Sequence, residues 1–106
     1  MDINGKLLKI VEQEMLERIY PNGDRYYGHS KKGEPHGMGV VIYANGDKYI
    51  GSFIGKGKDG QGAYYFANGD KYVGMFKNNK FNGSGSYSPL DGEVVNGIFK
   101  DNALVQ

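Results

Sequence analysis

The chain has 106 residues, a net charge of +1, 39% hydrophobic residues and no cysteine. This length fits one small domain. The near-neutral charge gives no support for a nucleic-acid partner, and the lack of cysteine excludes disulfides and thiol chemistry. The sequence has no signal-peptide pattern and no apolar run of about 20 residues, the length that spans a membrane. We therefore expect a cytoplasmic protein.

The first residues carry an amphipathic pattern. Its apolar members recur at helical spacing and are Leu7, Leu8, Val11 and Met15. This spacing predicts a helix over about residues 4–15. Residues 16–20 fit better as a lead-in strand, so residues 1–19 are assigned to a helix and a strand. The apolar stripe of the helix would cover the second face of the sheet near the first repeats, or else form the interface of a homodimer.

From Tyr20 onward, a nine-residue pattern recurs at an offset of 23 residues. It begins at Tyr20, Tyr43 and Phe66, and a degenerate copy begins at Pro89. Self-similarity at this period indicates stacked supersecondary units, none of which buries its apolar face alone. We therefore divide residues 20–106 into repeats at 20–42, 43–65 and 66–88, a half repeat at 89–102 and a C-terminal tail.

Each repeat contains the signals of a β-hairpin. The dipeptides Asn22-Gly23, Asn45-Gly46 and Asn68-Gly69 lie between extended, aromatic-rich flanks. They predict two-residue type I′ turns, in which both central residues have positive φ. Beyond each turn, aromatic residues and glycines alternate with a period of two, which places them on one face of a strand. A glycine on that face leaves room for the ring of a neighbouring strand. The expected fold is all-β, a single-layer array of hairpins with a short N-terminal helix.

The repeat unit resembles the MORN (membrane occupation and recognition nexus) repeat. The resemblance covers residues 20–102 and rests on the turn, the Tyr-x-Gly-x-aromatic strand, the loop and the Gly-x-Gly strand, including His36-Gly37-x-Gly39. It implies a solenoid of hairpins. It also implies one of the varied roles of MORN proteins, which include scaffolds, membrane-junction proteins and regulatory segments attached to lipid kinases or methyltransferases.

Nothing in the sequence predicts catalysis. The two histidines, His29 and His36, are not part of a compact Ser/His/Asp group, so we predict no catalytic residue. Asp24, Asp47 and Asp70 recur once per turn, and each is followed by a basic residue. They fit ordinary turn chemistry better than a calcium ladder. We predict neither a metal nor a cofactor.

Two surfaces are candidate binding sites. The aromatic–glycine face would form a groove for a helix or an extended peptide, and its rings are Tyr26, Tyr49, Phe53, Tyr64, Phe66, Tyr72, Phe76 and Tyr87. The distal loops form a basic edge that would attract anionic phospholipid, and its lysines are Lys31, Lys32, Lys56, Lys58, Lys77 and Lys80. With Glu34 and Asp59, this edge carries a net charge of +4.

The first hypothesis is a protein-binding adaptor, scaffold or small inhibitor that uses the aromatic face. The alternative is a peripheral phospholipid-binding module that uses the lysine edge and associates with membranes. Each rests on a surface, because a repeat array of this size carries no catalytic group that the sequence reveals. The identity of the partner is not encoded in the sequence.

Overall fold

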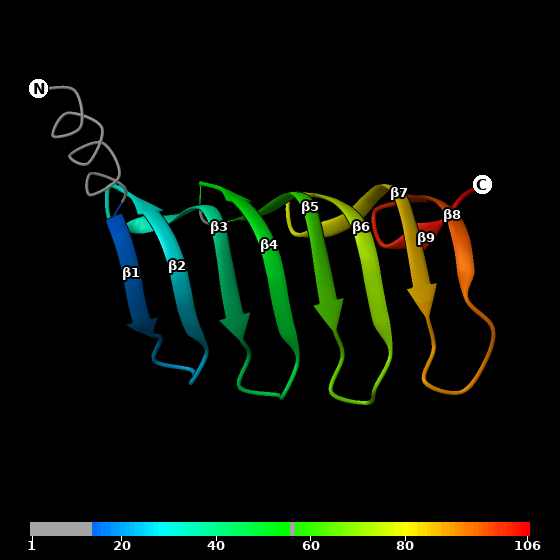
Figure 1. The fold of residues 1–106 in the computed structure, drawn as a ribbon, viewed down its shortest axis with the longest axis horizontal. Helices are drawn as coiled ribbons and strands as arrows, with labels where there is room; N and C mark the ends of the chain where they lie inside the picture. Colours follow the sequence, from blue (N-terminus) through cyan, green and yellow to red (C-terminus); the bar gives the residue numbers. More distant parts are fainter. Residues whose placement is uncertain (1–13, 56) are drawn as a thin grey trace, which may run out of the picture.

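The computed structural model of the chain describes residues 14–55 and 57–106. This part of the chain forms one antiparallel sheet of nine strands that lie in chain order (Figure 1). The strands are β1 (Glu14–Ile19), β2 (Arg25–Lys31), β3 (Glu34–Ile42), β4 (Lys48–Ile54), β5 (Gly57–Tyr65), β6 (Lys71–Lys77), β7 (Lys80–Ser88), β8 (Val95–Lys100) and β9 (Ala103–Leu104). The described residues contain no helix. The predicted all-β, single-layer array of hairpins is confirmed.

The predicted N-terminal helix lies outside the described residues, except for its last two positions. Glu14 and Met15 are not helical but belong to β1. The reason is the length of the β1–β2 ladder, in which Glu14 pairs with Ser30 and Met15 with His29. The lead-in strand expected from residue 16 is confirmed and begins two residues earlier.

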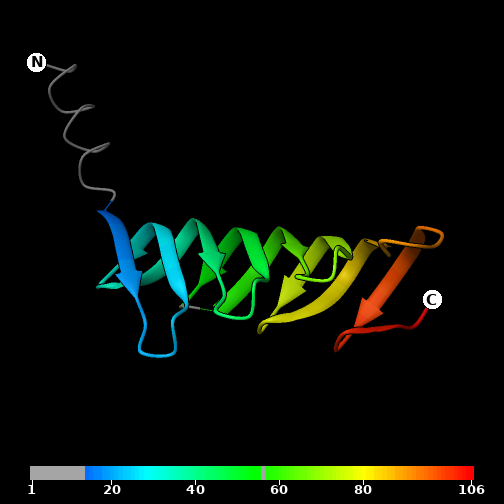
Figure 2. The ribbon, with the colours of Figure 1, turned by 90° about the horizontal axis from the view of Figure 1, so that it is seen from below.

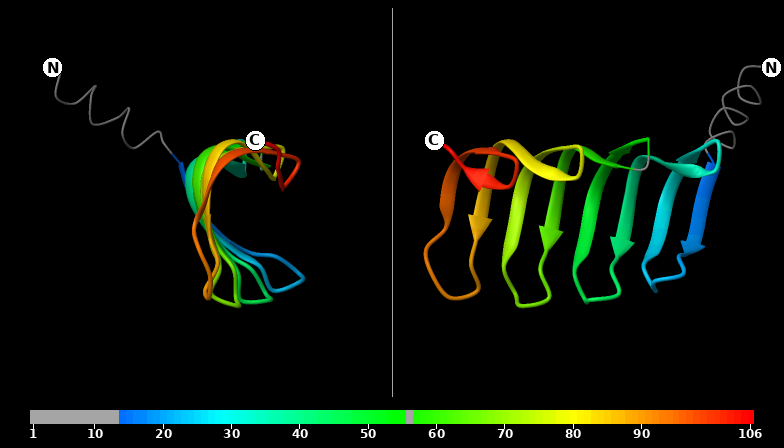
Figure 3. Two further views of the ribbon diagram at one scale, coloured as in Figure 1. Left: turned by 90° about the vertical axis from the view of Figure 1, so that its right-hand side faces the viewer. Right: turned by 180° about the vertical axis from the view of Figure 1, so that it is seen from behind.

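The sheet is an open, curled ribbon. The Asn-Gly turns and the β7–β8 connection follow one edge, and the other connections follow the opposite edge (Figures 1 and 2). Seen along the array, the strands bend into the shape of a C (Figure 3), and β1 and β9 lie at opposite ends without pairing. The sheet therefore has a concave and a convex face. We place the buried rings on the concave face. A single-layer sheet has no second layer to cover its side chains, so it can bury them only by curving around them.

The Asn-Gly turns differ from the prediction. Gly23 has a φ of 96°, but Asn22 is not among the residues with positive φ, so the turn is not type I′. The Gly23 N–H donates to the Tyr20 carbonyl at 2.9 Å, and the Tyr20 N–H donates to the Asp24 carbonyl at 2.8 Å. This pattern is the three-residue hairpin loop, a type I turn followed by a glycine of positive φ. The extra residue makes the loop too long for the two-residue type.

Paired positive φ values occur at the opposite edge of the sheet. The connection between β2 and β3 has φ values of 53° at Lys32 and 76° at Gly33. The connection between β6 and β7 has 49° at Asn78 and 72° at Asn79. These two-residue loops are the tight turns whose twist suits antiparallel strands. The two-residue turns that were predicted at the Asn-Gly dipeptides therefore occur at the opposite edge of the sheet.

The core consists of tyrosine rings that pack on glycines, as predicted. Tyr26, Tyr49 and Tyr72 are at most 1% exposed. A Cβ added at Gly62 would lie 2.5 Å from the Tyr49 ring, far inside contact distance. The Tyr49 hydroxyl donates to the Ser52 carbonyl at 2.8 Å, so burying it leaves no donor unpaired.

Gly62→Ala should destabilise the protein by about 1–3 kcal/mol, as overpacking a core does. The matched control is Gly57→Ala in the same strand, where an added Cβ would meet its nearest neighbour at 3.6 Å, an ordinary contact. Urea denaturation of both variants measures the two free energies of unfolding. Equal losses would contradict the ring-on-glycine core.

Candidate functional site

The predicted aromatic face divides into buried and accessible rings. Five of its eight members are at most 3% exposed and belong to the core, namely Tyr26, Tyr49, Phe53, Tyr72 and Phe76. These five rings were predicted to line the groove, but they are buried. Side chains from neighbouring strands cover them: Phe81 stacks on Tyr72 with centroids 3.9 Å apart, and the Lys58 ammonium lies 5.8 Å from the Tyr49 centroid. These rings offer a partner no surface.

The accessible rings form a ladder along the concave face. Tyr64, Phe66 and Tyr87 are half-buried, and so are Tyr20 and Tyr43, two rings outside the predicted set. The ring centroids are 5.7 Å apart for Tyr43–Tyr64, 4.8 Å for Tyr64–Phe66 and 5.8 Å for Phe66–Tyr87. We call these five rings the concave groove. The recurrence of an aromatic residue two positions before the Asn-Gly turns could have revealed Tyr20 and Tyr43.

Aspartates connect each turn to the next repeat and orient the groove tyrosines. Asp47 accepts the Ala67 N–H on Oδ1 and the Tyr64 hydroxyl on Oδ2, both at 2.7 Å. Asp70 accepts the Leu90 N–H at 2.9 Å and the Tyr87 hydroxyl at 2.7 Å. These bonds support the predicted structural role of the aspartates. No group of three potential metal ligands is found within residues 14–55 and 57–106.

The same bonds shift the ionisation of both partners. Burial opposes ionisation of Asp47, but the hydrogen bonds from Tyr64, Ala67 and Asn45 together hold its pKa below the ordinary value. Burial and the adjacent Asp70 carboxylate raise the pKa of Tyr87 to about 12. The raised pKa values of Tyr43, Tyr64 and Tyr87 keep these three hydroxyls protonated at physiological pH.

Lys58 lies in the concave groove and not at the lysine edge where it was predicted. Its Nζ donates to the Tyr43 hydroxyl at 2.9 Å and lies 5.3 Å and 5.7 Å from the ring centroids of Tyr43 and Tyr64. Burial lowers the pKa of Lys58, and the nearby Asp24 carboxylate opposes this shift. The groove therefore has a cationic centre among its rings.

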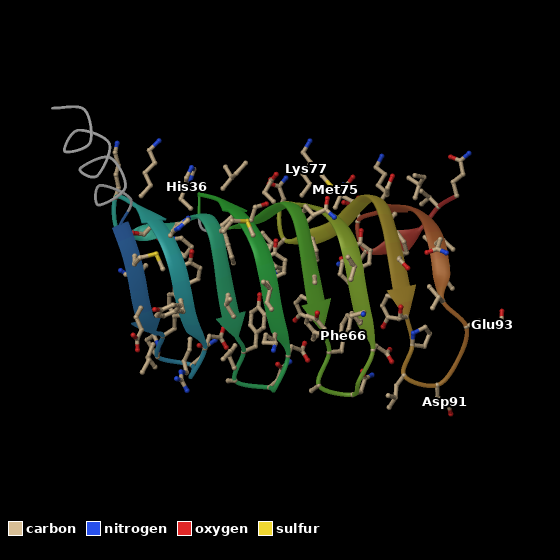
Figure 4. The ribbon with its side chains drawn as sticks, in the orientation of Figure 1. His36, Phe66, Met75, Lys77, Asp91 and Glu93 are labelled. Carbon is tan, nitrogen blue, oxygen red and sulfur yellow. The ribbon has the colours of Figure 1, made fainter. Side chains whose placement is uncertain are left out.

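The remaining lysine edge is smaller than predicted. Lys31, Lys32, Lys77 and Lys80 are exposed, whereas Lys56 lies outside the described residues. Figure 4 shows Lys77 at the edge opposite to the one that carries Asp91 and Glu93. Of the six lysines predicted at this edge, the four that are exposed in the described residues lie in two separate turns.

The convex face carries exposed apolar side chains. They include Met15, Ile19, Tyr27, Met38, Ile42, Ile50 and Ile54, which are 39–69% exposed. The segment predicted to cover them, residues 4–13, lies outside the described part of the chain. Coverage by this segment and homodimerisation through this face therefore both remain predictions.

Comparison with known families identifies the repeat. A family model described as MORN repeat matches residues 26–48, 49–71 and 72–88, which is more than half of the chain. The chain belongs to the MORN repeat family. The matched units have the predicted period of 23 residues but begin six residues later, at Tyr26, Tyr49 and Tyr72. No curated protein matches the chain.

The family is generally associated with binding. MORN repeats are modules associated with binding proteins or membrane lipids, and the match indicates no catalytic family. In the described part of the chain, no helix has the length and hydropathy needed to cross a membrane.

Alkaline pH should unfold the protein cooperatively. The pKa is raised in the fold for Tyr26, Tyr43, Tyr49, Tyr64, Tyr72 and Tyr87. A tyrosine whose pKa is raised by folding stabilises the folded state fully below pH 10.0, the pKa in the unfolded chain. This stability is lost as the pH rises through the pKa in the folded state, which is about 12 for Tyr43 and Tyr87. The lowered pKa of Lys58 makes stability increase with pH, but this is one group against six tyrosines.

Tyrosinate absorbance at 295 nm and circular dichroism, recorded together from pH 8 to 12, measure this unfolding. We expect the circular dichroism signal to be lost in one transition above pH 10, together with an increase in tyrosinate absorbance. Ionisation of most tyrosines near pH 10 with the fold intact would contradict the burial of these hydroxyls.

Proposed function

We propose that this MORN protein is a non-enzymatic adaptor, scaffold or small inhibitor that holds a segment of a partner protein in the concave groove. The observation that carries this proposal is the ladder of half-buried rings from Tyr43 to Tyr87. Aromatic side chains offer a large contact area at a low cost in conformational entropy, and they dominate protein interfaces. We expect the protein to act in the cytoplasm.

The shape of the groove supports this proposal. Two hollows lie on either side of Lys58, which lines both of them. The first has a volume of about 630 Å³ and includes Tyr20 and Tyr43, and the second has about 350 Å³ and includes Tyr64 and Phe66. Successive hollows between rings suit a chain that presents one anchoring side chain to each.

The orientation of the rings is fixed before a partner binds. The Tyr64 and Tyr87 hydroxyls are each held by an aspartate at 2.7 Å, and Lys58 holds Tyr43 at 2.9 Å. Rings that are already ordered lose little further entropy on binding. This pre-organisation favours recognition of a defined segment over loose hydrophobic adhesion.

Phe66→Ala should weaken binding of the partner by about 2 kcal/mol or more, as the loss of an interface hot spot does. The matched control is Tyr27→Ala, which removes an exposed ring of the convex face. Wild type and both variants, shown to be folded by circular dichroism, are immobilised and compared by quantitative mass spectrometry of the proteins they retain. Calorimetry with the retained partner then measures affinity. A partner that no longer binds Tyr27→Ala but still binds Phe66→Ala would show that the concave face is not the binding face.

A second candidate function is binding of anionic phospholipid through Lys31, Lys32, Lys77 and Lys80, because these four side chains are exposed. We rank it lower, because Lys58 is turned into the groove and basic residues near a membrane contribute only about 1 kcal/mol each.

Flotation with liposomes that contain phosphatidylserine tests this alternative. We expect weak flotation, because the four exposed lysines lie in two separate turns and each contributes only about 1 kcal/mol. Strong, salt-sensitive flotation that is lost when the four lysines are replaced by glutamine would make this a membrane-surface module.

A further inference from the structure

The first repeat interrupts the aromatic ladder. In the second and third repeats, the ladder contains Tyr64 and Tyr87, each of which donates its hydroxyl to an aspartate. The equivalent position in the first repeat, 23 residues before Tyr64, is Val41. Val41 is 8% exposed and has neither a ring nor a hydroxyl. One ring is therefore missing between Tyr20 and Tyr43.

The groups that would hold this ring are nevertheless in place. Asp24 accepts the Ala44 N–H on Oδ1 at 2.8 Å, the same contact that Asp47 and Asp70 make with the next repeat. Its Oδ2 accepts the side-chain amide of Asn22 at 3.1 Å. The equivalent Oδ2 of Asp47 accepts both an asparagine amide and a tyrosine hydroxyl. Asp24 thus keeps the geometry of the motif without the tyrosine donor.

A cavity occupies the place of the missing ring. Its volume is about 630 Å³, and its lining includes Tyr20, Asp24, Val41, Tyr43 and Lys58. Volumes of this order are typical of sites that enclose a side chain or a small ligand. The lining combines aromatic walls with two carboxylates, Asp24 and Glu34, and two cations, Arg18 and Lys58.

We propose that this cavity receives a tyrosine side chain of the bound partner segment, with its ring between Tyr20 and Tyr43 and its hydroxyl donating to Oδ2 of Asp24. The proposal rests on the proposed function, because the partner supplies the tyrosine. The guest would reproduce the contacts that Tyr64 makes with Tyr43, Phe66 and Asp47 inside the protein.

The chemistry of the cavity selects tyrosine over phenylalanine. A phenylalanine would cover the Asp24 carboxylate without supplying the hydroxyl hydrogen bond that Asp47 and Asp70 receive. Covering a carboxylate is costly when the hydrogen bonds it loses from water are not replaced.

The experiment uses N-acetyl-tyrosine amide as the probe and the side-chain methyl signals of Val41, observed by NMR, as the readout. We expect saturable shifts at Val41 in the millimolar range. N-acetyl-phenylalanine amide should bind at least tenfold more weakly. Equal binding of the tyrosine and phenylalanine probes, or no shift at Val41, would overturn the proposal.

The variant Val41→Tyr supplies the missing ring from the chain itself. The repeats at Tyr64 and Tyr87 already accommodate this residue, so the variant should fold and melt at a higher temperature than the wild type. It should also bind the tyrosine probe at least tenfold more weakly, because its own ring fills the cavity. Unchanged binding of the tyrosine probe would contradict the proposal. If the variant does not fold, the comparison of the tyrosine and phenylalanine probes on the wild type tests the proposal.

Partner binding separates this inference from the proposed function. A partner that binds Val41→Tyr as tightly as the wild type, yet loses affinity for Phe66→Ala, would retain the concave groove as the binding face and refute the tyrosine site. A partner indifferent to both substitutions would refute the proposed function. A tyrosine-containing partner that is weakened tenfold or more by Val41→Tyr, and equally by changing its own tyrosine to phenylalanine, would support both.

Discussion

The packing of a tyrosine ring on glycines of an adjacent strand is the constraint on which the rest of the fold depends. Tyr26, Tyr49 and Tyr72 each occupy space that a side chain on the facing strand would need. A Cβ added at Gly39, Gly62 or Gly85 would lie 2.3–2.5 Å from the nearest atom of the facing tyrosine. The rings can be buried in a single layer only because these strands carry no side chain there. The sheet curves around them, and this curvature creates the concave groove.

The aspartates transmit this order from one repeat to the next. Each binds a backbone N–H that lies 20 residues later in the chain. A second connection runs along the opposite edge, where Asn79 bonds the backbone of Lys58 and Asn102 bonds that of Phe81, 21 residues apart in each case. Neighbouring repeats are therefore fixed at both edges, which gives the groove rings one orientation. Nearest-neighbour coupling of this kind is what makes a repeat array cooperative.

The periodic features of the fold could be predicted from the sequence. The features that depend on the curvature of the sheet could not. The period, the strands and the ring-on-glycine core follow from local spacing, because side chains alternate across a strand with a period of two. The burial of Tyr49 and the inward direction of Lys58 depend on how far the sheet bends, which no local pattern encodes. The Asn-Gly loops were assigned the wrong type because a two-residue and a three-residue loop share the same dipeptide and differ only in where strand pairing ends.

Departures from the repeat determine the character of the groove. The position occupied by Lys58 holds Pro35 one period earlier and Phe81 one period later. Phe81 stacks on Tyr72 and closes the core beneath it, whereas Lys58 reaches across Tyr43, Tyr49 and Tyr64 and borders both hollows. A fully periodic chain would fill the concave face with its own rings. Hollows arise where a lysine or a valine replaces a ring, so the irregular positions of a repeat protein are where selectivity for a partner can be built.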